Sequence, residues 1–149
     1  LYAALHATGF ANQPTSRHRV DGLALTDALI TSIARCAPPG NRPSAEELAA
    51  CRPFLERELA LLPQTQVIVA LGQLAFDGCV RLLRDTGYEL PRLKFGHGQH
   101  YRLDRPGPTG PAHLLGCYHP SRQNTQTGRL TPAMMNEVFG WARVLIETD

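Results

Sequence analysis

Apolar residues return along this chain at the spacing of helices in some segments and in short unbroken runs in others. In 44–62, four leucines and a cysteine recur at helical spacing, and the opening Ser44-Ala45-Glu46-Glu47 is a capping box. In 132–146 the same spacing follows Thr131, a hydroxyl at the N-cap position with proline after it. We predict long helices in both segments. Residues 73–84 predict a shorter helix, and residues 1–10 the end of another, with Gly9 as its C-cap glycine.

Short runs of apolar and β-branched residues predict the strands. Segments 66–71 and 113–118 are typical of buried strands, and 25–35 is interpreted as a further strand. Segment 94–102 has weaker strand character around a glycine-rich turn, Phe95-Gly96-His97-Gly98. Strands that alternate with helices predict an α/β fold, with a parallel sheet covered by helices on both faces.

The composition narrows the class of protein without deciding it. The 149 residues are enough for one domain with its own core, and no apolar run is long enough to span a bilayer. A net charge of +2 is weak evidence for a nucleic-acid partner. Arginine dominates the basic residues, and its planar guanidinium favours bidentate phosphate contacts, but this does not establish such a partner. Four cysteines in a chain of this length indicate reduced thiols rather than a secreted disulfide scaffold.

The most informative stretch begins where the apolar run 113–118 ends. His119 follows directly, and the carboxyl ends of strands are where open α/β sheets bind ligands. Pro120 then forces a turn, and a polar loop leads to the predicted helix at Thr131. His-Pro-Ser alone is a common turn, and a single histidine at a strand end is more often structural than catalytic. The residues that continue the pattern are therefore decisive.

The whole segment 119–131, His-Pro-Ser-Arg-Gln-Asn-Thr-Gln-Thr-Gly-Arg-Leu-Thr, resembles the last motif of the uracil-DNA glycosylase superfamily, and its family 5, or type b, in particular. The resemblance implies a three-layer α/β sandwich around a central, mostly parallel four-stranded sheet. It also implies an enzyme that flips uracil, with other deaminated bases as further candidates, out of DNA and hydrolyses the N-glycosidic bond.

The same resemblance assigns roles within the motif. It makes His119 the catalytic residue, a hydrogen-bond donor to the uracil oxygen that gains charge, and it places Ser121 at the substrate. The family's loop enters the minor groove of DNA, and the matching DNA-binding candidates are Arg122, Gln123, Asn124 and Arg129.

Cys36 and Cys51 are separated as C-x14-C, a spacing that by itself favours two free thiols. The resemblance instead implies two of the four ligands of a [4Fe–4S] cluster. The family's other two ligands form a C-x-x-C, a motif that this sequence lacks. Cys79 and Cys117 do not match the family's ligands and are interpreted as core residues.

Asn41 stands between the two cysteines, in a proline-rich loop. An isolated loop asparagine is most often a turn residue. The resemblance makes this one the uracil-reading amide, whose acceptor and donor match the edge of the base.

The resemblance runs from Leu1 to about Arg143. The family's first strand, its glycine-rich motif and its C-x-x-C precede the segment that matches here. We therefore expect residues 1–149 to be the carboxyl-terminal part of a single domain, inactive or nearly so alone. The resemblance further implies a monomer in the bacterial cytoplasm.

Two alternatives stay open. One is a DNA-binding module on the same fold without catalysis. The other is a small-molecule α/β hydrolase or transferase that uses His119, although no nucleophile elbow or phosphate-binding glycine loop supports it.

Overall fold

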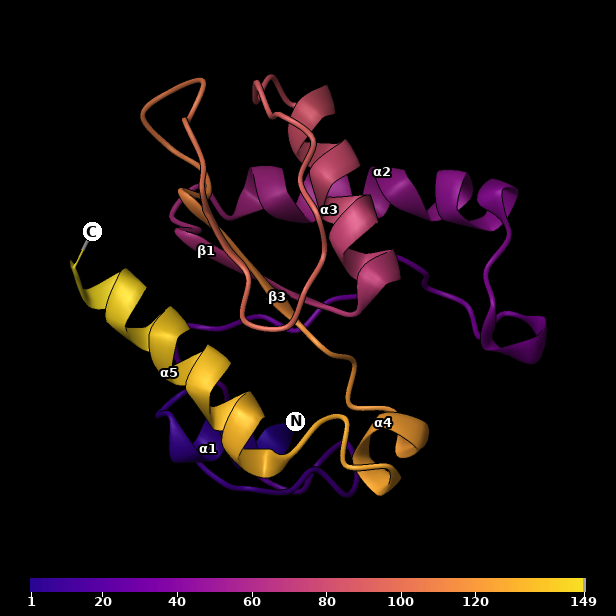
Figure 1. Cartoon of the computed structure of the whole chain (residues 1–149), viewed down its shortest axis with the longest axis vertical. Coiled ribbons are helices and arrows are strands. Elements are labelled where there is room, and N and C mark those ends of the chain that lie inside the picture. The colour runs from indigo at the N-terminus through magenta and orange to yellow at the C-terminus, as the bar shows by residue number, and fades with distance from the viewer. Residues whose placement is uncertain (149) are drawn as a thin grey trace.

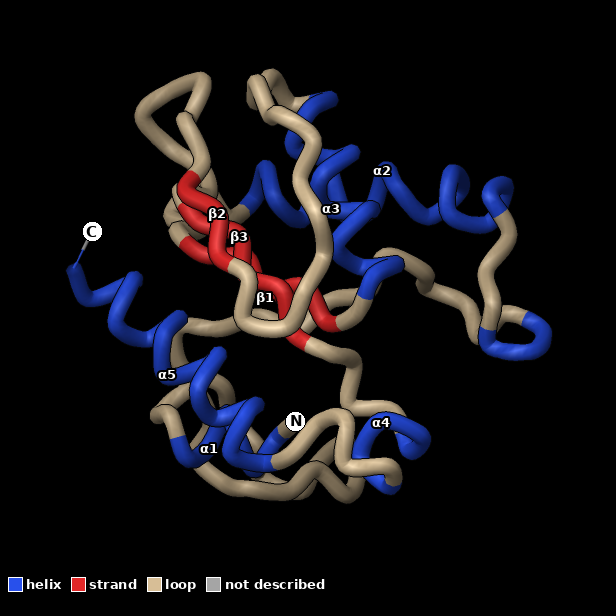
Figure 2. The backbone as a smooth tube through the Cα atoms, in the orientation of Figure 1, coloured by secondary structure: helices blue, strands red, loops and turns tan. Residues whose placement is uncertain are grey.

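The fold is built on a small mixed sheet between two layers of helices (Figure 1). The computed structural model describes residues 1–148, except for the side chain of Asn41. Strand β1 (Val67–Leu71) runs parallel to β3 (His113–Cys117) along its whole length, and β2 (His100–Arg102) runs antiparallel on the other side of β3 (Figure 2). The α/β class predicted from the sequence is confirmed. No helix within residues 1–148 is both long and apolar enough to cross a membrane.

One face of the sheet is covered by α1 (Tyr2–Ala7) and α5 (Pro132–Thr148). Leu115 and Cys117 of β3 are buried against these helices. Helix α5 begins as its sequence predicts, because Thr131 accepts the backbone N–H of Met134 at 3.2 Å. The predicted apolar positions of α5 are buried in the same cluster: Met135, Val138, Phe139 and Ala142.

The opposite face is covered by α3 (Gln73–Asp85), whose Phe76 and Leu83 pack against Ala70 and Leu114. Because neighbouring residues of a strand point to opposite faces, β3 contributes to both clusters in alternation. A helix is thus packed on each face of the sheet, as predicted.

Helix α2 (Ala45–Leu61) lies outside α3 (Figure 1). Its capping box is present: Ser44 Oγ accepts the Glu47 N–H at 3.1 Å, and the Glu47 carboxylate accepts the Ser44 N–H at 2.7 Å. Cys51 is its buried residue, while Phe54 and Leu61 are 58% and 69% exposed. The helix therefore forms as predicted, but its apolar spacing does not produce a tightly buried face.

The prediction of a strand at 25–35 was wrong. Among residues 1–148 this segment has no neighbouring strand to share backbone hydrogen bonds, apart from one isolated bridge between Leu25 and Ala11. Asp27 adopts a φ of 55°, which interrupts any extended run. Leu25 and Ala28 at the start of the segment pack against the core, but Leu29 and Ile30 are 58% and 42% exposed, so the rest of the segment is not buried as a sheet strand would be. The third strand of the sheet is instead β2, which the sequence indicated weakly, and it is antiparallel.

The polar segment after His119 also differs from its prediction as a loop. Residues Arg122–Gln126 form a short helix, α4, which begins at Ser121. Ser121 Oγ accepts the Asn124 N–H at 3.2 Å, a local hydrogen bond that satisfies a free donor in the first turn. A second short element, the 3₁₀ helix η1 (Pro39–Asn41), forms in the proline-rich loop.

Candidate functional site

His119 is exposed and stands at the carboxyl ends of both parallel strands. Gly72 directly follows β1 with a φ of 93°, and its N–H donates to the carbonyl of Cys117 at 2.7 Å. A Cβ added at Gly72 would lie 3.1 Å from the Cβ of His119. The close approach of the two strand ends therefore requires a residue without a side chain at position 72. The predicted place of His119, at the edge of the sheet where such folds bind ligands, is confirmed.

The turn after His119 is fixed through its carbonyl oxygen. That oxygen accepts the N–H of Ser121 at 2.8 Å and the side-chain amide of Asn124 at 2.9 Å. Two donors on one carbonyl restrict the rotation of the peptide that follows the histidine. The imidazole itself is free to face solvent, so its backbone is held while its ring is presented.

The predicted DNA-binding residues fall into two groups. Arg122 and Gln123 are exposed on the first turn of α4, immediately beside the histidine turn. Asn124 uses its amide within the protein, and Arg129 returns toward the strand end, with its guanidinium 4.8 Å from the centre of the Tyr118 ring. The structure thus gathers all four around the His119 turn.

Two residues near His119 were not assigned a role from the sequence. His97 accepts the backbone N–H of Tyr118 through Nδ1 at 3.1 Å, and Phe95 lies 6.1 Å from Tyr118 between ring centres. The only signal in the sequence was the glycine-rich turn 95–98, which does not reveal what the turn contacts.

Cys36 and Cys51 line one small pocket of about 110 Å³, together with two prolines of the same loop, Pro38 and Pro43. Cys36 is exposed, whereas Cys51 is buried and its sulfur accepts the N–H of Arg35 at 3.3 Å. Such an N–H···S contact stabilises a thiolate ligand, so the surroundings of Cys51 fit a metal-bound sulfur. Within residues 1–148, no group of three or more His, Cys, Asp or Glu side chains could hold a metal ion. The four cluster ligands that the resemblance implies are therefore not brought together within residues 1–148.

Asn41 ends η1, between the two cysteines. Its side chain lies outside the described part of the structure, so its predicted role is untested. Gly40 beside it adopts a φ of 63°. Figure 1 shows this loop projecting beyond the end of α2, away from the sheet.

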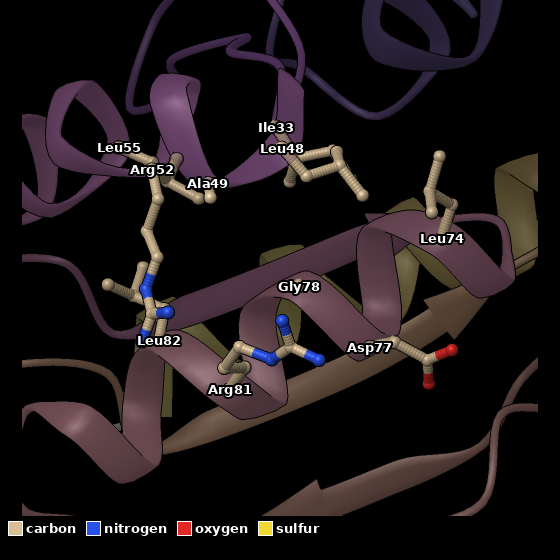
Figure 3. A pocket seen from close by; sticks show the side chains of 10 residues that line it. All are labelled: Ile33, Leu48, Ala49, Arg52, Leu55, Leu74, Asp77, Gly78, Arg81 and Leu82. Atoms are coloured by element: carbon tan, nitrogen blue, oxygen red, sulfur yellow. The ribbon is translucent and has the colours of Figure 1, made fainter. Parts of the chain in front are cut away.

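A larger cavity of about 240 Å³ separates α2 from α3 (Figure 3). Its walls are mainly aliphatic and include Ile33, Leu48 and Leu74, with Arg52 and Arg81 among the lining residues. It contains none of the predicted site residues. The cavity reflects the loose packing of α2 on α3.

The chain is similar to proteins of one family over nearly its whole length. A family model described as Uracil DNA glycosylase superfamily matches residues 1–143. The type-5 uracil-DNA glycosylase of Mycobacterium bovis is 44% identical over 146 residues, which are 97% of this chain and 52% of that protein. The Thermus thermophilus type-5 enzyme is 46% identical over 145 residues, 97% of this chain and 62% of that protein. A type-4 uracil-DNA glycosylase of Archaeoglobus fulgidus is 33% identical over 101 residues, 67% of this chain and 48% of that protein. The chain thus spans between half and two thirds of the length of these type-5 relatives.

Proposed function

This chain belongs to the uracil-DNA glycosylase superfamily, and we therefore propose that it forms part of a DNA-repair enzyme that removes uracil from DNA. The enzyme would flip the base out of the duplex and hydrolyse the bond between the base and the deoxyribose, leaving an abasic site. The observation that supports this most directly is the exposed imidazole of His119 on a turn fixed at the carboxyl edge of the sheet.

His119 is proposed to stabilise the departing base. When the C1′–N1 bond breaks, its electron pair stays on uracil and negative charge develops on the O2 oxygen, while the sugar becomes positive. An imidazole N–H aimed at O2 interacts more strongly with this anion than with the neutral base. Such a difference lowers the barrier to the chemical step.

Helix α4 is proposed to contact the DNA from which the base is taken. Extruding a base costs a few kcal/mol of stacking and pairing, which side chains inserted into the duplex offset. Arg122 and Gln123 are the exposed candidates, because Asn124 is hydrogen-bonded within the turn. Ser121 is proposed to lie at the substrate while capping this helix, and Arg129 to approach a phosphate.

The loop 34–51 is proposed to contribute the uracil-reading amide of Asn41 and two ligands of an iron–sulfur cluster. Cys36 and Cys51 would hold the metal, and the pocket that they share supports this assignment. A cluster bound there would tie the loop to α2 and would have no part in the hydrolysis.

A chimera tests the proposed function without assuming that the chain is complete. The matched segment of the Thermus thermophilus relative, at 46% identity, is replaced by this chain. The chimera is incubated with a uracil-containing duplex, and abasic sites are cleaved with alkali. We expect uracil excision, and a loss of about 100-fold to 1,000-fold in the His119→Ala variant, the usual cost of one donor to a developing anion. His6→Ala, which alters an exposed histidine on α1, is the matched control and should leave excision unchanged.

The two alternatives give different results in the same assay. A folded chimera that binds the duplex but releases no uracil would favour a DNA-binding module without catalysis. A folded chimera with neither binding nor excision would exclude both DNA functions.

A further inference from the structure

The turn that contains His97 lies directly against the end of strand β3. The N–H of Gly98 donates to the carbonyl of Gly116, and the N–H of Gly116 donates to the carbonyl of Gln99, both at 2.8 Å. A Cβ at Gly116 would overlap the carbonyl oxygen of Gly96. The turn is therefore bound to β3 at a residue three positions before His119.

His97 continues this attachment beyond the last residue of β3. Tyr118 follows the strand, and its N–H donates to Nδ1 of His97 at 3.1 Å. The two rings are also in contact, with centres 5.0 Å apart and planes tilted by 39°. Because Nδ1 accepts a hydrogen bond, the proton of the neutral ring resides on Nε2.

The peptide that His97 holds is the one before Tyr118, so it lies one residue ahead of His119. The far side of His119 is fixed separately, through the carbonyl that accepts from Ser121 and Asn124. On the near side, the peptide between Cys117 and Tyr118 is held at both of its polar groups: its carbonyl accepts the N–H of Gly72 at 2.7 Å, and its N–H donates to Nδ1 of His97 at 3.1 Å. Loss of the bond to His97 would leave this peptide held through its carbonyl alone, so the peptide could tilt about the hydrogen bond from Gly72 and shift the imidazole of His119 with it.

We propose that His97 is a positioning residue for His119, acting through the hydrogen bond between its Nδ1 and the N–H of Tyr118. This inference rests on the proposed function, because it assumes that His119 meets the departing base. A misplacement of about 1 Å at a reacting group is enough to slow a reaction about 100-fold.

Two substitutions separate the hydrogen bond from the ring contact. In His97→Asn, the amide oxygen stands near the place of Nδ1 and keeps an acceptor for Tyr118, while the ring is lost. In His97→Phe, the ring against Tyr118 is kept and the acceptor is lost. In the chimera, single-turnover excision should fall about 10-fold to 100-fold in His97→Phe and recover most of that loss in His97→Asn. Duplex affinity should stay within about twofold in both variants, because neither changes a residue proposed to touch DNA.

Nuclear magnetic resonance of the full chain provides a readout that does not depend on activity. The Tyr118 amide proton should move upfield and exchange faster in His97→Phe, and the ring resonances of His119 should shift with it. Both sets of signals should stay near their original positions in His97→Asn.

The experiments test the roles proposed for His97 and for His119 independently. If the His119 signals do not move in His97→Phe, or if excision is equal in the two variants, His97 does not position His119. If the His119→Ala chimera excises uracil normally, the proposed role of His119 is wrong. The spectra still show in that case whether His97 sets its orientation.

Discussion

At the scale of single residues, the four cysteines show how their surroundings decide reactivity. Cys36 is exposed at the edge of the pocket that it shares with Cys51, whereas Cys79 and Cys117 are buried on opposite faces of the sheet. Burial raises the pKa of the thiols of Cys79 and Cys117 to about 11 in each case. Since the thiolate is the reactive form, these two side chains should be inert near neutral pH.

Alkylation with iodoacetamide at pH 8 should therefore modify Cys36 first. A thiol with a pKa of about 11 is ionised to roughly one part in a thousand at that pH, and burial also blocks the reagent. Peptide mass spectrometry over time should show Cys79 and Cys117 unmodified in the folded chain and all four cysteines modified in urea. Modification of Cys79 or Cys117 at the rate of Cys36 in the native chain would show that the core opens readily.

The structural surroundings of the site residues could be predicted from the sequence for some residues and not for others. The position of His119 was predictable, because an apolar run followed by proline defines a strand end locally. The cap formed by Ser121 is also local, although it was missed because the polar residues after it suggested a loop. The contact of His97 with Tyr118 joins positions 21 residues apart, and only the folded chain brings them together. No local pattern could have predicted it.

At the scale of elements, helices were easier to predict than strands. Capping residues such as Ser44 and Thr131 act within one turn, so the sequence predicts where a helix begins. A strand needs a partner, and among residues 1–148 the segment 25–35 has no partner strand, only the single bridge between Leu25 and Ala11. Strand β2 became part of the sheet because it pairs with β3, despite its weak pattern. The error at 25–35 follows from this difference between local and long-range interactions.

Two glycines of these elements should respond in opposite directions to alanine. Gly116 lies in β3 with no space for a Cβ beside the Gly96 carbonyl, so Gly116→Ala should lower the free energy of unfolding by about 1–3 kcal/mol. Gly140 lies in α5 with nothing within 4 Å of an added Cβ. Gly140→Ala should raise that free energy by up to about 1 kcal/mol, since alanine is the better helix former.

Urea denaturation followed by circular dichroism gives both values under the same conditions. An unchanged midpoint in Gly116→Ala would mean that the turn 95–99 can move away from β3. It would also weaken the proposed role of His97, which depends on that attachment.

At the scale of the whole molecule, a pair of histidines connects the sheet to its covering helix. Nε2 of His100 in β2 and Nδ1 of His113 in β3 are 2.9 Å apart, and His113 is 4% exposed. Burial, and then the charge of His113, lower the pKa of His100 from its usual 6.5. The folded chain therefore resists protonation of His100 more strongly than the unfolded chain does.

This difference predicts how stability depends on pH. Below about pH 6.5 the unfolded chain binds a proton at His100 that the folded chain resists, so the free energy of unfolding falls as the pH decreases. Well above that pH His100 is neutral in both the folded and the unfolded chain, so this residue no longer makes the free energy of unfolding depend on pH. Thermal unfolding between pH 5 and 8 should show this slope, and it should be smaller in His100→Gln, which keeps a hydrogen-bonding group without titrating.

His6→Gln, at an exposed position on α1, is the control and should keep the slope of the original chain. Equal slopes in His100→Gln and the original chain would show that His100 does not contribute to the pH dependence.

The tryptophan beside this histidine pair is a built-in spectroscopic probe. Trp141 is the only tryptophan of the chain, and its ring meets that of His100 edge to face, with centres 4.7 Å apart. Intrinsic fluorescence excited at the red edge of protein absorption therefore originates at a single point, where Trp141 of α5 meets His100 of β2. Protonated imidazole quenches indole emission, so the emission intensity would follow the charge of His100, and its wavelength would follow the separation of the helix from the sheet. Unfolding of that interface can be followed in this way without any added label.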